Sequence, residues 1–100
     1  MAKQKSSVKE RFRIDEPELF DVILLNDDET TMDFVVWLLQ AIFHKNEFES
    51  EEIMWRVHIT GKGVAGTYPL DIALSKRDAA HEAAEMEHFP LRLEVEPHKG

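Results

Sequence analysis

The polar residues best suited to binding chemistry stand at the end of a short apolar run. Asn26, Asp27 and Asp28 carry amide and carboxylate oxygens, which accept hydrogen bonds. Met32 and Val35 follow at a spacing of three residues, which is the spacing of neighbours on one helix face. A polar cluster beside an apolar helix face is typical of the mouth of a binding pocket.

A second group of residues could form the opposite wall of such a pocket. Met54, Val57 and His58 have the i, i+3, i+4 spacing of one helix face. If the two helices pack together, an apolar pocket with polar groups at its rim results. Each part also has an ordinary interpretation: apolar residues at helical spacing usually form a core, an Asn-Asp-Asp run usually forms a turn, and a lone histidine is usually a satisfied core residue. The residues alone leave both interpretations open.

Catalytic and metal chemistry find little support in the sequence. The chain has no cysteine, no Gly-x-Ser-x-Gly, no phosphate-binding loop and no His-Glu-x-x-His. None of its five histidines forms an i, i+4 pair, and Asp27 with Asp28 falls short of the six or more oxygens that calcium prefers. We therefore expect no enzyme, no metal and no cofactor.

Composition narrows the class of protein further. A chain of 100 residues with 43% hydrophobic and 32% charged residues fits one soluble domain. The net charge of the whole chain is −8. Residues 1–13 carry five basic groups and one acid, a net +4, so residues 14–100 carry a net charge of −12. Such an acidic remainder is unsuited to nucleic acid. No run approaches the ~18 apolar residues of a membrane span, and no secretory signal is present, so we expect a cytoplasmic protein without membrane contact.

The hydrophobic pattern and the breaker residues predict six elements in the order β-α-α-β-α-β. The predicted strands are 20–25, 63–68 and 91–96, and the predicted helices run from about 30 to 43, 51 to 60 and 70 to 86. Thr30 or Thr31 is the expected N-cap of the first helix, Ser50 that of the second, and Pro69 opens the third. Short strands need support, so we expect an α+β domain in which a three-stranded antiparallel or mixed sheet packs against three helices on one side.

This core is expected over residues 17–97, after a flexible extension over 1–16 and before a short tail over 98–100. Within the core, three segments together resemble the ClpS adaptor family. Residues 20–35 read Phe-x-Val-Ile-Leu-x-Asn-Asp-Asp-x-Thr-x-Met-x-Phe-Val, residues 57–68 read Val-His-x-x-Gly-Lys-Gly-Val-x-Gly-x-Tyr, and residues 88–91 read His-x-Pro-Leu. The resemblance extends over roughly residues 19–96.

The resemblance implies a monomeric, non-enzymatic adaptor. Such an adaptor binds substrate proteins that begin with Leu, Phe, Tyr or Trp and delivers them to the N-terminal domain of a Clp AAA+ unfoldase, ClpA or ClpC, for degradation by ClpP. The implied ligands of the substrate's α-amine are Asn26, Asp27 and His58; the implied side-chain pocket is Asp28, Thr30, Met32, Val35, Met54, Val57 and Leu91; and the implied unfoldase contacts are Asp71, Leu74 and Lys76. The residue types suit the role, because an ammonium has three donors and carboxylate, amide and neutral imidazole are acceptors.

The sequence also departs from the family pattern. Thr31 stands where the family usually has Pro, and Leu74-Ser75-Lys76 stands where it has Glu-Thr-Lys. The second change removes a carboxylate from the expected docking surface. Two alternatives therefore remain open: a ClpS-like regulator that occupies the unfoldase and inhibits other substrates without recognising N-termini, and a generic protein-interaction module with a similar fold.

Overall fold

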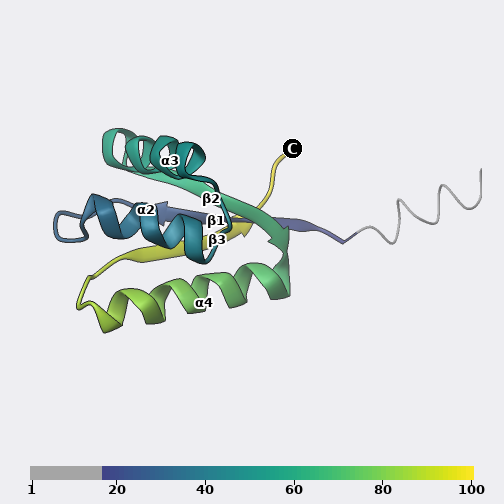
Figure 1. Cartoon of the computed structure of the whole chain (residues 1–100). Coiled ribbons are helices and arrows are strands. Elements are labelled where there is room, and N and C mark those ends of the chain that lie inside the picture. The colour runs from purple at the N-terminus through teal and green to yellow at the C-terminus, as the bar shows by residue number, and fades with distance from the viewer. Residues whose placement is uncertain (1–16) are drawn as a thin grey trace, which may run out of the picture.

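The computed structural model describes residues 17–100, and the predicted flexible extension over residues 1–16 lies outside the described residues. Six elements follow one another along the chain (Figure 1). They are β1 (Leu19–Leu25), α2 (Met32–Ala41), α3 (Glu47–Thr60), β2 (Lys62–Pro69), α4 (Leu70–Met86) and β3 (Arg92–Pro97). The predicted α+β class and the β-α-α-β-α-β order are confirmed.

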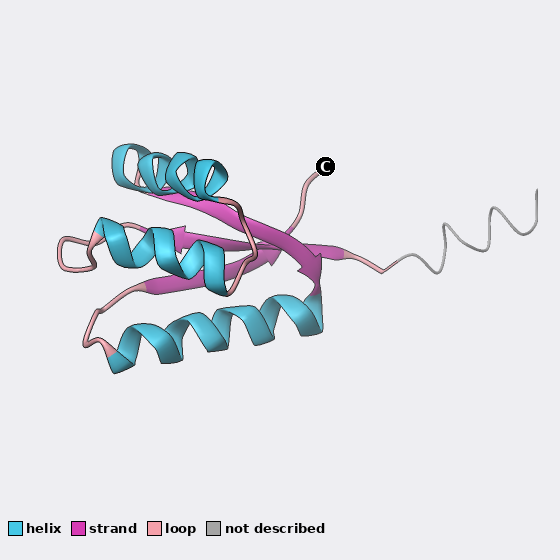
Figure 2. Cartoon of the chain, in the orientation of Figure 1, coloured by secondary structure: helices cyan, strands magenta, loops and turns pink. Residues whose placement is uncertain are grey.

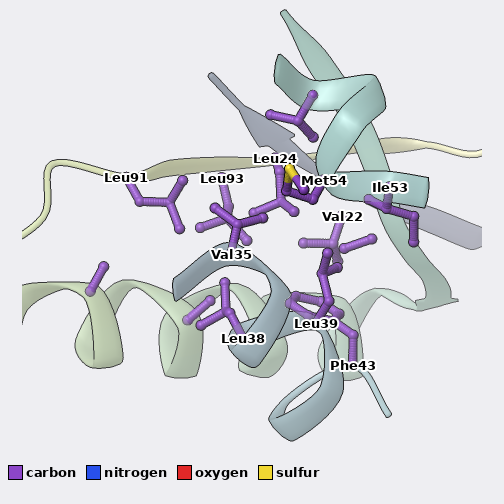
Figure 3. Close-up of a cluster of buried hydrophobic side chains, with 14 of the residues drawn as sticks. Val22, Leu24, Val35, Leu38, Leu39, Phe43, Ile53, Met54, Leu91 and Leu93 are labelled. Atoms are coloured by element: carbon purple, nitrogen blue, oxygen red, sulfur yellow. The ribbon is translucent and has the colours of Figure 1, made fainter. Parts of the chain in front are cut away.

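The three strands form one antiparallel sheet in the order β2-β1-β3 (Figure 2). The central position of β1 explains why its Val22 and Leu24 are completely buried. These two side chains point to the same face of the sheet, because side chains alternate along a strand. They belong to one buried cluster with residues of all three helices and with Leu93 of β3 (Figure 3). The three helices therefore pack on one face of the sheet, as expected.

The start of α3 corrects one prediction. Asn46, and not Ser50, is the N-cap: the Asn46 side chain accepts a hydrogen bond from the Glu49 N–H at 2.8 Å. The Glu49 carboxylate in turn accepts from the Asn46 N–H at 3.0 Å, which completes a capping box. Ser50 lies inside the helix with no exposed surface, and its hydroxyl has no hydrogen-bond partner among residues 17–100. The expected connection over 44–49 is correspondingly shorter.

The first helix agrees better with its prediction. Thr31 is the N-cap of α2, and its hydroxyl accepts from the Phe34 N–H at 3.1 Å. The helix ends at Ala41, slightly before the predicted end at Phe43, and Phe43 packs into the core just beyond it. In the part of the chain that the structure describes, no helix is both long and apolar enough to span a bilayer.

Three backbone features bring the end of β1 and the start of β2 close to the end of α3. The Asn26 N–H donates to the Gly61 carbonyl at 2.9 Å. Gly61 closes α3 with φ +96°, a left-handed conformation that favours glycine. At Gly63 a Cβ would lie 3.0 Å from a methyl group of Val57, so only glycine lets β2 approach the helix this closely without a shift. These contacts place residues 26–28 next to the last turns of α3.

Candidate functional site

A hollow of about 350 Å³ lies between the loop after β1, the start of α2 and one face of α3. Its lining residues are Asn26, Asp27, Asp28, Glu29, Thr30, Thr31, Met32, Val35, Met54, Val57 and His58. Nine of the ten residues expected in the pocket are therefore brought together, all except Leu91. Glu29 and Thr31 also line the hollow but were not predicted for the pocket, although both lie between Asp28 and Met32, which were.

The inner wall of the hollow is apolar. Val35, Met54 and Val57 are 7%, 7% and 4% exposed, so their side chains belong both to the core and to the hollow. Val35 of α2 and Met54 of α3 lie in the same buried cluster (Figure 3). Met32, at 39% exposed, stands at the opening. This arrangement can accept an apolar side chain from solvent without exposing new core surface.

The carboxylate of Asp27 organises the loop at the mouth. One of its oxygens accepts from the backbone N–H groups of Glu29 and Thr30, at 2.8 and 2.7 Å. The other oxygen accepts from the Thr30 hydroxyl at 2.7 Å. Burial raises the pKa of Asp27, but the bonds from the Thr30 hydroxyl, the Thr30 N–H and the Glu29 N–H together hold this pKa below its ordinary 3.8. Asp27 is thus a fixed negative charge at neutral pH.

Asp27 keeps some capacity to bind a cation. An ionised carboxylate offers about four acceptor positions on its two oxygens, and the three donors of the loop leave the oxygen that faces Thr30 able to accept again. The side chains of Asn26 and His58 are exposed and line the same hollow. The mouth therefore combines one fixed carboxylate with an amide and an imidazole that can accept hydrogen bonds.

The aromatic ring of Trp55 stands beside His58. The indole and imidazole rings meet edge to face, with centroids 5.8 Å apart and an interplanar angle of 74°. This contact places the exposed indole next to the imidazole at the mouth. Trp55 was not among the residues predicted for the pocket.

Leu91 does not line the hollow. It is 6% exposed and belongs to the hydrophobic core just before β3 (Figure 3). Its contribution in this structure is to packing among the core residues. Any effect of Leu91 on a ligand would have to pass through those neighbours.

The residues expected to contact an unfoldase lie elsewhere. Asp71 and Lys76 line a shallow hollow of about 480 Å³ between the end of α2 and the start of α4, whereas Leu74 is not part of its lining. The ammonium of Lys76 donates to the Ile42 carbonyl at 2.6 Å and lies 5.7 Å from the centre of the Tyr68 ring. Lys76 thus stabilises the C-terminal end of α2, where a cation is favoured. Residues 17–100 contain no group of three histidine, aspartate or glutamate side chains that could hold a metal ion.

Comparison with known proteins identifies relatives over nearly the whole chain. The family model of "ATP-dependent Clp protease adaptor protein ClpS" matches residues 15–94. The protein named ATP-dependent Clp protease adapter protein ClpS in Campylobacter jejuni is 44% identical to this chain, over 92% of this chain and 96% of that protein. The protein of the same name in Acetivibrio thermocellus is 46% identical, over 94% of this chain and 97% of that protein.

A solved structure is similar to this chain in both fold and sequence. The structure of Agrobacterium tumefaciens ClpS2 bound to L-phenylalaninamide is similar with a TM-score of 0.79 and 35% identity. The similarity covers 83% of this chain and all of that one.

Proposed function

The chain belongs to the ClpS family of adaptor proteins of the ATP-dependent Clp protease, and on that premise we propose that its hollow binds the N-terminal residue of substrate proteins. The proposed substrates begin with Leu, Phe, Tyr or Trp. The observation that carries the proposal is the hollow itself, which joins an apolar wall to a mouth with a fixed carboxylate and the side chains of Asn26 and His58. The related Agrobacterium protein bound to L-phenylalaninamide supports it, because that ligand combines a free α-amine with an aromatic side chain.

The α-ammonium of the substrate would bind at the mouth. Its three donors and full charge match Asp27, Asn26 and a neutral His58. Each charge-assisted hydrogen bond contributes about 1.5–3 kcal/mol. An acetylated or internal nitrogen has no positive charge and fewer hydrogen-bond donors. With such a ligand in place, the Asp27 carboxylate would lose water without gaining a charged partner, which weakens binding. Selectivity for a true N-terminus follows.

The first side chain would enter the apolar part of the hollow. Burial of a Leu or Phe side chain against Val35, Met54 and Val57 contributes about 1.5–3 kcal/mol. The flexible Met54 side chain can adjust to aromatic or aliphatic guests. After the entropy loss of association, we expect micromolar affinity, or about −8 kcal/mol.

Delivery requires a second surface that contacts the unfoldase. We place this surface at the hollow lined by Asp71 and Lys76. Leu74 does not line the hollow but directly precedes Ser75, which does. The Lys76 ammonium already donates one hydrogen bond to the Ile42 carbonyl, so only its remaining donors would be available to contact the unfoldase. The proposed partner is the N-terminal domain of ClpA or ClpC, and the proposed site of action is the cytoplasm.

The test compares free and blocked N-termini. Fluorescence anisotropy with C-terminally labelled peptides beginning with Leu, Phe, Tyr or Trp should give micromolar binding, and their N-acetylated versions should bind at least tenfold more weakly. Equal binding of both sets would contradict the proposal.

A degradation assay with the Clp unfoldase and ClpP separates delivery from simple inhibition. The variant Asp27→Ala should lose delivery of a Leu-initiated substrate. A regulator that does not recognise N-termini would instead be unaffected by this change, which would favour the inhibitory alternative.

A further inference from the structure

An exposed apolar stripe runs along α3 on the side next to the hollow. Phe48, Trp55 and Ile59 are 72%, 48% and 74% exposed. Their spacing of seven and four residues places them on one face of the helix. Large apolar side chains are exposed here although the same helix buries Ile53, Met54 and Val57 on its other side. The stripe is therefore surface that the fold of residues 17–100 does not cover.

The stripe is continuous with the mouth of the hollow through Trp55. His58 lines the hollow, and the Trp55 ring contacts the His58 ring edge to face at 5.8 Å. Ile59 follows Trp55 by four residues and extends the same surface by one turn. A ligand that leaves the hollow past His58 meets Trp55 first.

Three exposed carboxylates lie near this exit. Asp28 and Glu29 line the mouth and are exposed. Glu51 precedes Trp55 by four residues, so it lies next to it on the helix face, and it is exposed as well. An indole with carboxylates nearby favours apolar side chains and cations that stack on its ring, and it disfavours anions.

The occupant that this position favours is the substrate segment that directly follows the N-terminal residue, because the indole adjoins His58 at the mouth. An extended chain advances about 3.3–3.6 Å per residue, and its side chains alternate in direction. If the first side chain is in the hollow and the chain leaves past His58, the side chain at position two or three lies within reach of Trp55. We propose that Trp55 is a specificity-determining residue, which contacts this side chain and favours apolar or cationic residues there. The inference rests on the proposed function of the hollow.

The experiment uses the full chain and labelled peptides that all begin with Leu. A reference peptide has Gly at positions two and three, and the others place Leu, Arg or Glu at one of these positions. Wild-type protein should bind the Leu and Arg peptides about three- to tenfold more tightly than the reference at one of the two positions, and the Glu peptide more weakly. Trp55→Ala should abolish these differences while the reference affinity changes less than about threefold.

Trp37→Ala is the matched control. Trp37 is 51% exposed, close to the 48% of Trp55, but it lines a separate hollow on α2 with Phe34 and Met86. This variant should keep the wild-type ratios, and Trp55→Phe should keep the apolar preference. Thermal unfolding checks that each variant is folded.

Three outcomes would overturn the inference. Wild-type affinities that do not vary with positions two and three would do so, and so would unchanged ratios in Trp55→Ala. A uniform loss of affinity for every peptide in Trp55→Ala would show that Trp55 acts only by orienting His58. These results differ from a failure of the proposed function, in which the wild-type chain binds no Leu-initiated peptide at all.

Discussion

Asp27→Asn isolates the charge at the mouth of the hollow from the shape of the loop. An asparagine oxygen can keep the two bonds from the N–H groups of Glu29 and Thr30, which are 2.8 and 2.7 Å long in the wild type. The amide nitrogen can donate to the Thr30 hydroxyl, which reverses the direction of the third bond. Asparagine also suits such turns as well as aspartate does. We therefore expect the loop to remain and the free energy of unfolding to fall by no more than about 1 kcal/mol.

Binding should suffer far more than folding. The variant loses the charged partner of the substrate ammonium, and hydrogen bonds to charged groups contribute about 1.5–3 kcal/mol. Because Asp27 is only partly buried, water screens the pair and the lower half of this range applies. The expected loss of affinity is about 10- to 40-fold.

The assay is fluorescence anisotropy with a C-terminally labelled Leu-initiated peptide, alongside urea unfolding of each variant. Asp33→Asn is the matched control, because it changes the net charge by the same amount. Asp33 is exposed in the first turn of α2 and does not line the hollow. It should bind within about twofold of wild type. A folded Asp27→Asn variant that binds as tightly as wild type would refute the role of this carboxylate.

Three further predictions concern stability, each measured by urea unfolding. The folded-state pKa of Asp27 lies below its ordinary 3.8, so the ionised carboxylate stabilises the fold fully above pH 3.8, and this contribution is lost as the pH falls through the folded-state pKa. Wild type should therefore lose more stability than Asp27→Asn between about pH 5 and 2.5. Equal losses in the two proteins would argue against this role of the Asp27 carboxylate. Ser50→Ala removes a buried hydroxyl without a partner among residues 17–100 and should raise stability by about 0.5–1 kcal/mol, whereas a decrease would indicate an unseen partner. His88→Gly should raise stability by about 0.5 kcal/mol relative to His88→Ala, because position 88 has φ +60° after α4; equal stability of the two variants would contradict this.

Two parts of the hollow's lining could be picked out from the sequence because their signals are local, although the residues alone also allowed an ordinary core and turn. A run of Asn-Asp-Asp ends a strand by its side-chain chemistry alone, and the spacing of Met54, Val57 and His58 identifies one helix face without tertiary information. That these two parts meet depends on the pairing of Asn26 with Gly61, which is a long-range contact. The sequence interpretation obtained it only by assuming that the two helices pack together.

The wrong N-cap reflects a missed local signal as well as burial. Both Asn46 and Ser50 are followed by glutamates that suit a first helical turn, but only Asn46 has a glutamate three residues later, Glu49, which is the capping-box pattern. Ile53 stands at the corresponding place after Ser50. Ser50 lies on the same face as Ile53, Met54 and Val57, and all four are buried. Burial of this face against the core extends the helix back to Asn46, and the serine hydroxyl loses its solvent as a result.

The two proposed surfaces lie at opposite ends of α2. The residues at its start line the hollow, and the carbonyl of Ile42 just past its end accepts from Lys76 on α4. A helix of ten residues is about 15 Å long, so a peptide residue in the hollow does not cover the region around Asp71 and Lys76. A substrate and an unfoldase could therefore be bound at once, which an adaptor requires and a simple inhibitor does not. Because α2 contributes to both surfaces and packs tightly through Leu38 and Leu39, any substitution that shifts this helix should affect both kinds of binding together.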